Sequence, residues 1–332
     1  MNPSIFIIAE AGVNHNGSLE LARQLIDKAA WAGVDAVKFQ SFKANKLLTR
    51  DTPKASYQKK TIAGDSQFEM IQKLELNYED HIVLRDYTRE KGLEFMSTPF
   101  DHDSIDLLAE IGVKRYKVGS GDLTNVPYLR HMASKKLPII LSTGMAEMYE
   151  IRHAVNTIIS TDFPKENLTI LHATTEYPAP FAEINLRAML SMKEDLQLTI
   201  GYSDHTPGIE VPIAAAALGA RVIEKHFTLD KNMEGPDHKA SLEPDELRQM
   251  VKAIRNIEIA LGNGKKEPSP SEIENIPAAR KSLVAAIPIK KGALFTSENL
   301  CVKRPGSGIS PLRWDEFIGK PAPKNYKKDQ LI

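Results

Sequence analysis

The sequence of 332 residues predicts an α/β fold, a (β/α)8 TIM barrel over residues 1–262 followed by a small C-terminal domain. Eight short apolar segments alternate with segments of helical periodicity, which is the repeat of such a barrel. The short segments are rich in Val, Ile and Leu without polar alternation, as expected of strands covered on both faces. A doubly wound open sheet is the alternative, but no glycine-rich dinucleotide loop follows the first strand.

The same patterns place each element along the chain. The predicted strands are Ile5–Ala9, Ala36–Gln40, Glu94–Ser97, Arg115–Val118, Pro138–Ser142, Leu168–His172, Gln197–Gly201 and Val222–Glu224. The predicted helices are Leu19–Ala32, His81–Lys91, Ser104–Ile111, Val126–Ser134, Glu147–Ile159, Leu186–Ser191, Glu210–Leu218 and Glu243–Leu261. The loop 41–67 is long, polar and basic, which suits a lid or binding loop and equally a solvated surface excursion.

After Leu261 the regular alternation stops. Residues 263–277 mix Gly, Pro, Ser and charged residues without periodicity, which indicates an interdomain linker. Residues 278–332 form a separate small domain with 11 basic and 4 acidic residues, a net charge of 11 − 4 = +7. Because about 55 residues make a small core, we expect this domain to pack against the barrel or a partner subunit.

Composition limits the classes of function. Acidic and basic residues balance at 43 each, which argues against a dedicated nucleic-acid or membrane-surface protein. The single cysteine, Cys301, cannot form an internal disulfide, as expected in a reducing cytoplasm. Neither a signal peptide nor an apolar run of membrane-spanning length is recognisable, so we expect a soluble cytoplasmic protein.

Two histidines end the seventh and eighth predicted strands. His205 and His226 flank a strand–helix–strand unit, whose strands should be parallel, so both imidazoles should lie at the carboxyl end of the barrel. Either histidine alone is more simply an interior hydrogen-bonded residue. As a pair without a thiolate, they would leave most of a coordination shell to water or substrate, which suits catalytic Mn²⁺ or Mg²⁺.

Hydroxyl groups and one lysine follow several other strands. These residues are Thr98, Lys117, Ser120, Ser142, Thr175 and Ser203. Glycines beside them allow close approach of the backbone, so the set is suited to hold a phosphate or a carboxylate. Ordinary loop composition explains any one of these residues, but explains poorly a hydroxyl at so many strand ends.

Three carboxylates are candidates for proton transfer or for binding sugar hydroxyls: Glu10, Asp122 and Asp237. Simple ion pairing with Lys38 or Lys117 is the other interpretation. An anionic phospho-ligand, a metal-polarised carbonyl and acid/base carboxylates together indicate a lyase or a carbon–carbon bond-forming enzyme.

The motifs AEAGVNHNG, VKFQSF, STPF, KVGSGD, STGM, TTEYPAP, GYSDHT, EKHFTLD and GPDHKAS resemble, in order, those of the sialic acid synthase family of nonulosonic acid synthases. The segments RKSLVAAIPIKKG and VKRPGSGIS resemble its antifreeze-like C-terminal domain. The resemblance implies a transferase that condenses phosphoenolpyruvate with an N-acylated mannosamine-type sugar, releasing phosphate.

The resemblance also implies roles for single residues. His205 and His226 would hold Mn²⁺ or Mg²⁺, and the hydroxyl–lysine set named above would bind phosphoenolpyruvate. The residues that would contact the acceptor sugar are Glu10, Lys38, Gln40, Tyr177 and Asp237. Arg304 matches an arginine that one subunit places over the barrel of its partner, which implies a domain-swapped homodimer. Asp122 stands where some members carry Glu, as a candidate base for water, and Thr175 stands where some carry Asn.

Several alternatives remain open at this point. KVGSGDLTN and TTEYPAP resemble the legionaminate-type synthases, whose acceptor is 2,4-diacetamido-2,4,6-trideoxymannose, ahead of N-acetylneuraminate synthases and pseudaminate synthases. Deoxy-octulosonate and deoxy-heptulosonate phosphate synthases would need a second basic cluster for the phosphate of their acceptor. A non-catalytic sugar-binding or ice-binding protein would need neither the histidine pair nor the lysine–hydroxyl set.

Overall fold

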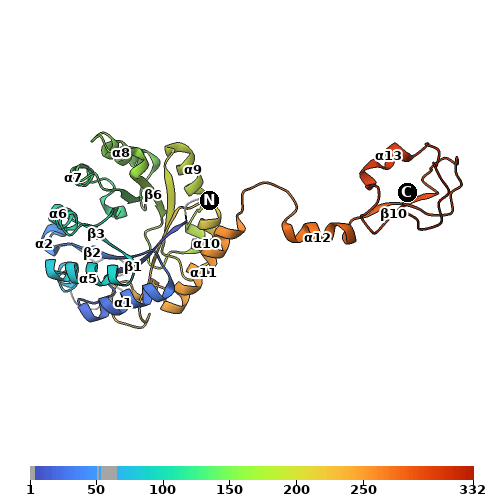
Figure 1. The fold of residues 1–332 in the computed structure, drawn as a ribbon. Coiled ribbons are helices and arrows are strands. Elements are labelled where there is room, and N and C mark those ends of the chain that lie inside the picture. Colours follow the sequence, from blue (N-terminus) through green and yellow to red (C-terminus); the bar gives the residue numbers. More distant parts are fainter. Residues whose placement is uncertain (1–3, 51, 54–65) are drawn as a thin grey trace. The chain divides into compact units, whose positions relative to one another are not determined.

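The computed structural model describes residues 4–50, 52–53 and 66–332. The chain divides into two compact units, Met1–Gly262 and Asn263–Ile332. In the first unit, strands occupy the centre and helices surround them (Figure 1), which confirms the predicted barrel class.

Eight strands form one sheet in the order β3-β2-β1-β8-β7-β6-β5-β4, and every paired neighbour is parallel. They are β1 Phe6–Gly12, β2 Ala36–Ser41, β3 Glu94–Pro99, β4 Tyr116–Val118, β5 Ile139–Ser142, β6 Leu168–Ala173, β7 Thr199–Asp204 and β8 Val222–His226. Strands β3 and β4 lie side by side, but the described residues form no hydrogen-bonded ladder between them. The barrel is therefore closed by packing at that seam.

The helices of the first unit begin where local capping favours them. Ser18, Asn77 and Asp101, for example, accept hydrogen bonds from the first turns of α1, α5 and α6. The longer helices are α1 Leu19–Ala32, α5 Tyr78–Glu90, α6 His102–Glu110, α7 Val126–Ser134, α8 Met148–Ile159, α9 Arg187–Leu196, α10 Glu210–Ala217 and α11 Pro244–Ala260. Short helices are α2 Ala44–Leu47, α4 Gln67–Gln72 and the 3-10 turns η1 Ser120–Asp122, η2 Lys165–Asn167, η3 Phe181–Glu183 and η4 His238–Ala240.

The predicted loop 41–67 is partly helical in its described part, because α2 lies within it and α4 begins at its end. Ser66 and Glu69 form a capping box that fixes the start of α4. The basic residues Lys54, Lys59 and Lys60 of this loop lie outside the described residues.

The interior of the barrel is layered. A buried apolar layer consists of Ile8, Ala36, Met96, Ile140, Leu171 and Val222. Successive inward side chains on a strand are two residues apart, so Glu10, Lys38 and Glu224 lie one step closer to the carboxyl end than this layer. The apolar layer therefore forms the floor beneath a polar layer.

The strands run further at their carboxyl ends than the sequence predicts. β1 ends at Gly12, β7 at Asp204 and β8 at His226, rather than at Ala9, Gly201 and Glu224. The polar residues expected after the strands thus lie within them. Parallel pairing continues through these positions, as in Glu10↔His226, because polar partners offset the cost of burial.

A fully buried ion pair joins the outer faces of β7 and β8. Lys225 Nζ lies 2.5 Å from Asp204 Oδ2, and both side chains have 0% exposure. Lys225 also donates to the Thr206 carbonyl, while Thr206 Oγ1 donates to the Asp204 carboxylate. These contacts hold together the two strand ends that carry the histidines.

The second unit has its own small core. Strands β9 Ser282–Ala285 and β10 Leu300–Lys303 pair antiparallel, and its other elements are α12 Pro270–Ala279, η5 Pro311–Arg313 and α13 Trp314–Phe317. Ala285, Phe295, Leu300 and Tyr326 are among the residues of its apolar cluster.

The interpretation of residues 263–277 as irregular linker is wrong for its second half, where α12 begins at Pro270. Ser269 caps this helix, proline is favourable in its first turn, and Glu272 completes a capping box.

In the described part of the chain, no helix combines the length and the apolar character needed to cross a bilayer.

Replacing Lys225 by Met should destabilise the protein by about 3–5 kcal/mol, because it leaves the Asp204 carboxylate buried without its partner. Chemical denaturation monitored by circular dichroism would measure the loss. Lys231→Met is the matched control, since the Lys231–Glu246 pair is partly exposed, and it should cost about 1 kcal/mol or less. Equal losses in the two variants would contradict a special role for the buried pair.

Candidate active site

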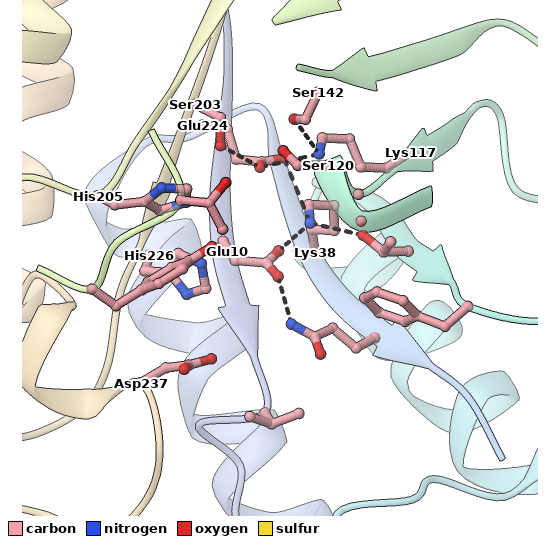
Figure 2. A pocket seen from close by; sticks show the side chains of 18 of the residues that line it. Glu10, Lys38, Lys117, Ser120, Ser142, Ser203, His205, Glu224, His226 and Asp237 are labelled. Carbon is pink, nitrogen blue, oxygen red and sulfur yellow. Dashed lines mark hydrogen bonds and ion pairs between the residues drawn. The ribbon is translucent and has the colours of Figure 1, made fainter. Parts of the chain in front are cut away.

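A cavity of ≈ 260 Å³ opens at the carboxyl ends of the barrel strands. Figure 2 shows polar side chains from several strands pointing into it. Its lining includes these predicted site residues: Glu10, Lys38, Gln40, Thr98, Lys117, Ser120, Ser142, Thr175, Tyr177, Ser203, His205, His226 and Asp237. The structure thus brings side chains from all eight strands of the sheet, or from the loops that follow them, to one place.

Two lysines and two glutamates form the buried charged end of the cavity. Lys38 Nζ lies 2.7 Å from Glu10 Oε2 and 3.5 Å from Glu224 Oε2. Lys117 Nζ lies 3.4 Å from Glu224 Oε1, which also accepts a 2.8 Å hydrogen bond from Ser203 Oγ. Glu224 therefore bridges both ammonium groups, as the dashed lines in Figure 2 show.

Burial and pairing act on these groups in opposite directions. Burial alone would raise the pKa of Glu224, but Lys117 and Lys38 outweigh it and lower that pKa to about 2. Burial raises the pKa of Glu10 to about 7, against the opposing effect of Lys38. Near neutral pH, Glu10 is therefore partly protonated, and this end of the cavity has excess positive charge for an incoming anion.

Each of the two ammonium groups donates a hydrogen bond to a hydroxyl group. Lys117 Nζ donates to Ser142 Oγ at 2.8 Å, and Lys38 Nζ donates to Thr98 Oγ1 at 2.9 Å. Ser120 Oγ accepts a hydrogen bond from the backbone N–H of Gly144. The hydroxyl proton of Ser120 remains available to an anion.

Gly144 keeps this region open. A Cβ at Gly144 would lie 2.1 Å from Thr175 Oγ1 and 2.9 Å from Ser120 Oγ, so only glycine fits. Thr175 Oγ1 is buried and has no hydrogen-bond partner among the described residues. Because a buried hydroxyl without a partner is costly, this position is suited to a ligand oxygen.

His205 and His226 lie together on the other side of the cavity, with ring centroids 5.5 Å apart. Burial lowers the pKa of both imidazoles, so both are neutral near pH 7 and able to bind a metal. His205 Nδ1 hydrogen-bonds the Thr174 carbonyl at 2.6 Å, which orients the ring and leaves its Nε2 available. His226 Nδ1 is buried without a partner among the described residues.

These features fit a divalent cation with an open coordination shell. Within residues 4–50, 52–53 and 66–332, no cluster of three or more His, Cys, Asp or Glu forms a complete protein cage. Two imidazoles would leave the remaining positions to water or substrate oxygens, as in catalytic rather than structural sites.

Tyr177, Gln40 and Asp237 complete the polar wall. The Tyr177 ring lies 4.2 Å from the His205 ring and 5.6 Å from the His226 ring, measured between centroids. Gln40 Nε2 donates to Glu10 Oε1 at 3.3 Å. Burial raises the pKa of Asp237 to about 6, and Figure 2 shows its carboxylate below the His226 side chain.

Two predicted residues do not line this cavity. Asp122 lies on η1, where its carboxylate accepts a hydrogen bond from Asn125 Nδ2 at 3.2 Å. Arg304 belongs to the second compact unit.

Sequence reasoning missed Glu224 as a member of the site. The available signal was its separation of two residues from His226 on one strand, which places both side chains on the same inner face.

Comparison with known proteins identifies both parts of the chain. Residues 25–266 match the NeuB family, and residues 280–332 match the SAF domain. N,N'-diacetyllegionaminic acid synthase of Campylobacter jejuni is 56% identical over 98% of this chain and 98% of its own. The enzyme of the same name from Legionella pneumophila is 48% identical over 95% of this chain and 89% of its own.

A solved structure supports the same conclusion. The crystal structure of an N-acetylneuraminic acid synthetase from Leptospira borgpetersenii, in complex with citrate, has a TM-score of 0.73 and 36% identity. It covers 83% of this chain and 91% of that one. The sequence matches, together with this likeness in fold, show that the chain belongs to the NeuB family and ends in a SAF domain.

Proposed function

We propose that this protein condenses phosphoenolpyruvate with 2,4-diacetamido-2,4,6-trideoxymannose to give N,N'-diacetyllegionaminate and phosphate. The observation that carries the proposal is one cavity that joins a buried, hydroxyl-lined lysine end to a pair of neutral imidazoles. Identity of 56% to a protein named for this product supports the choice of acceptor. N-acetylneuraminate synthesis from N-acetylmannosamine is the second candidate, favoured by the likeness to the Leptospira enzyme.

The lysine end would bind the phosphate and carboxylate of phosphoenolpyruvate. Lys117 supplies the charge, and Ser120 and Thr175 supply hydroxyl groups that do not depend on other protein acceptors. Thr98, Ser142 and Ser203 keep the ammonium and carboxylate groups in place. These preformed donors would also stabilise the charge that grows on the phosphate as its bond to carbon breaks.

The imidazole side would bind the aldehyde end of the acceptor. His205 and His226 would hold Mn²⁺ or Mg²⁺, which when bound polarises a carbonyl oxygen. Gln40, Tyr177 and Asp237 line the same side and would orient the hydroxyl and amide groups of the sugar.

Substrates bound in this way would have their reacting carbons next to each other. The enol carbon of phosphoenolpyruvate forms a bond to the aldehyde carbon, water adds to the carbon that bears the phosphate, and the C–O bond to phosphate breaks. Glu10 lies between the two ends (Figure 2), so we assign it the proton exchange with this water in preference to Asp122. Its hydrogen bonds to Lys38 and Gln40 fix the orientation of its carboxyl group.

We also propose that the active form is a homodimer in which Arg304 of one copy completes the cavity of the other. The resemblance of VKRPG to the family's antifreeze-like domain and the net charge of +7 over residues 278–332 support this proposal. A cytoplasmic location would suit the unpaired Cys301.

Phosphate release from phosphoenolpyruvate in the presence of Mn²⁺ should be faster with the diacetamido-trideoxy sugar than with N-acetylmannosamine. A colorimetric phosphate assay and mass spectrometry of the nine-carbon product would measure the preference. A preference for N-acetylmannosamine would instead support the second candidate, and absence of release with either sugar would overturn the proposed reaction.

His226→Ala should lower turnover by at least about 100-fold and weaken Mn²⁺ binding in calorimetry, because one of two imidazole ligands is lost. His131→Ala is the control, since His131 lies on α7 and pairs with Asp106 at the surface. Normal Mn²⁺ affinity in the His226 variant would refute the metal assignment.

Arg304→Ala should raise the KM for the acceptor sugar about tenfold or more, since a charged hydrogen bond contributes about 1.5–3 kcal/mol. The KM for phosphoenolpyruvate should change much less. Arg313→Ala tests loss of another arginine from the same unit and should leave both constants unchanged. The proposed role of Arg304 fails if neither KM moves in its variant.

A further inference from the structure

One side of the cavity is apolar, although the rest is charged or polar. Its apolar lining consists of Val13, Phe42, Leu47, Ile71 and Phe100. Val13 and Phe42 are buried, and they pack with Leu74 in a small cluster separate from the main core. Leu47, Ile71 and Phe100 are only half-buried, so they keep apolar surface toward the cavity. We call these three residues the apolar wall.

The alternation of side chains along β2 and β3 places Phe42 and Phe100 above the polar layer. Phe42 follows Lys38 and Gln40 at intervals of two residues, and Phe100 follows Thr98 in the same way. The backbone keeps the ends of β2 and β3 together here, because Phe100 N–H donates to the Ser41 carbonyl at 2.9 Å. The two aromatic rings contact each other nearly edge to face, with centroids 6.2 Å apart.

The segments that carry Leu47 and Ile71 are fixed by hydrogen bonds. At the start of α2, Lys43 N–H donates to Asp101 Oδ2 at 3.1 Å and Ala44 N–H donates to Glu75 Oε1 at 2.6 Å. Asp101 directly follows Phe100 and also caps α6. The wall therefore has a defined position beside the cavity before any ligand enters.

If the cluster only anchored α2 and α4 to the barrel, its side chains should all be buried. The buried members fit this role, but the half-buried members do not. An anchor gains most from complete burial, since each methylene removed from water adds to the stabilisation. Leu47, Ile71 and Phe100 keep apolar surface that a ligand could bury. The ligand must then combine groups for the polar side with an apolar group for this wall.

We propose that Leu47, Ile71 and Phe100 form a subsite for the methyl group at C6 of the acceptor, so that a 6-deoxy sugar is selected over its 6-hydroxy counterpart. This inference rests on the proposed function and specifies its acceptor. The aldehyde end of the sugar would face His205 and His226, and the far end would reach the wall. A hydroxyl group placed there would lose its hydrogen bonds with water and find no acceptor among these three side chains.

Two acceptors that differ by one oxygen test the proposal: 2,4-diacetamido-2,4-dideoxymannose and 2,4-diacetamido-2,4,6-trideoxymannose. The wild-type protein should use the 6-deoxy sugar with a kcat/KM about tenfold higher or more, the usual scale for one small group in an apolar pocket. Phosphate release at saturating phosphoenolpyruvate gives both constants.

Leu47→Asn and Ile71→Thr should each reduce this ratio toward one, chiefly by lowering kcat/KM for the 6-deoxy sugar. The KM for phosphoenolpyruvate should be unchanged, because neither residue belongs to the lysine end. The conservative variants Leu47→Met and Ile71→Val should retain the preference. Ile259→Thr is the matched control, since Ile259 is 81% exposed on α11, and thermal unfolding would show that each variant is folded.

The possible results distinguish failure of the subsite from failure of the proposed function. If the wild-type protein uses both sugars without preference, or the polar variants keep the wild-type ratio, the subsite is overturned while the proposed reaction stands. If no acceptor supports phosphate release, the proposed function and the subsite both fail. A ratio that falls in the polar variants and persists in the conservative ones supports the apolar wall as the selector.

Discussion

The site depends on one buried carboxylate. Two buried ammonium groups at the bottom of the cavity would each carry a desolvation cost of several kcal/mol, and they would also repel each other. Glu224 contacts both of them, and Ser203 donates to the same carboxylate, so this end of the barrel is stable before an anion arrives. The apolar floor beneath keeps water out and strengthens each of these interactions.

Side chains alternate between the two faces of β7 and β8, so the residues of the cavity point inward and the ion pair that joins the strands points outward. Glu224 and His226 take inward positions on β8, and His205 directly follows β7, whereas Asp204 and Lys225 take outward positions on the two strands. The outward ion pair is buried under the helices and joins the strands at the level of the histidines. A shift of one residue in either strand would exchange these sets, so the register of the barrel determines the site.

The sequence was sufficient for the barrel because its strands are short, apolar and regularly spaced, and for most of the cavity because strand ends share one face. The sequence was insufficient where the local pattern does not show which way a side chain points. Asp122 shares a motif with Ser120 yet turns toward Asn125. Glu224 becomes recognisable only once the inward direction of His226 is known, because the two residues are two positions apart on one strand. The helix that begins at Pro270 was not predicted, because the serine and proline that favour its start also occur in linkers.

The two parts of the cavity lining differ in how well they should tolerate substitution. The lysines and Glu224 belong to one connected buried network, so replacing any of them leaves a partner group unsatisfied. In the apolar wall, Leu47 and Ile71 lie on the short helices α2 and α4, and Phe100 directly follows β3. All three pack in the small apolar cluster outside the main core. Substitution there alters the shape and polarity offered to the far end of a sugar without disturbing the charged network. The proposed acceptor subsite could therefore vary while the buried charged network of the strands stays fixed.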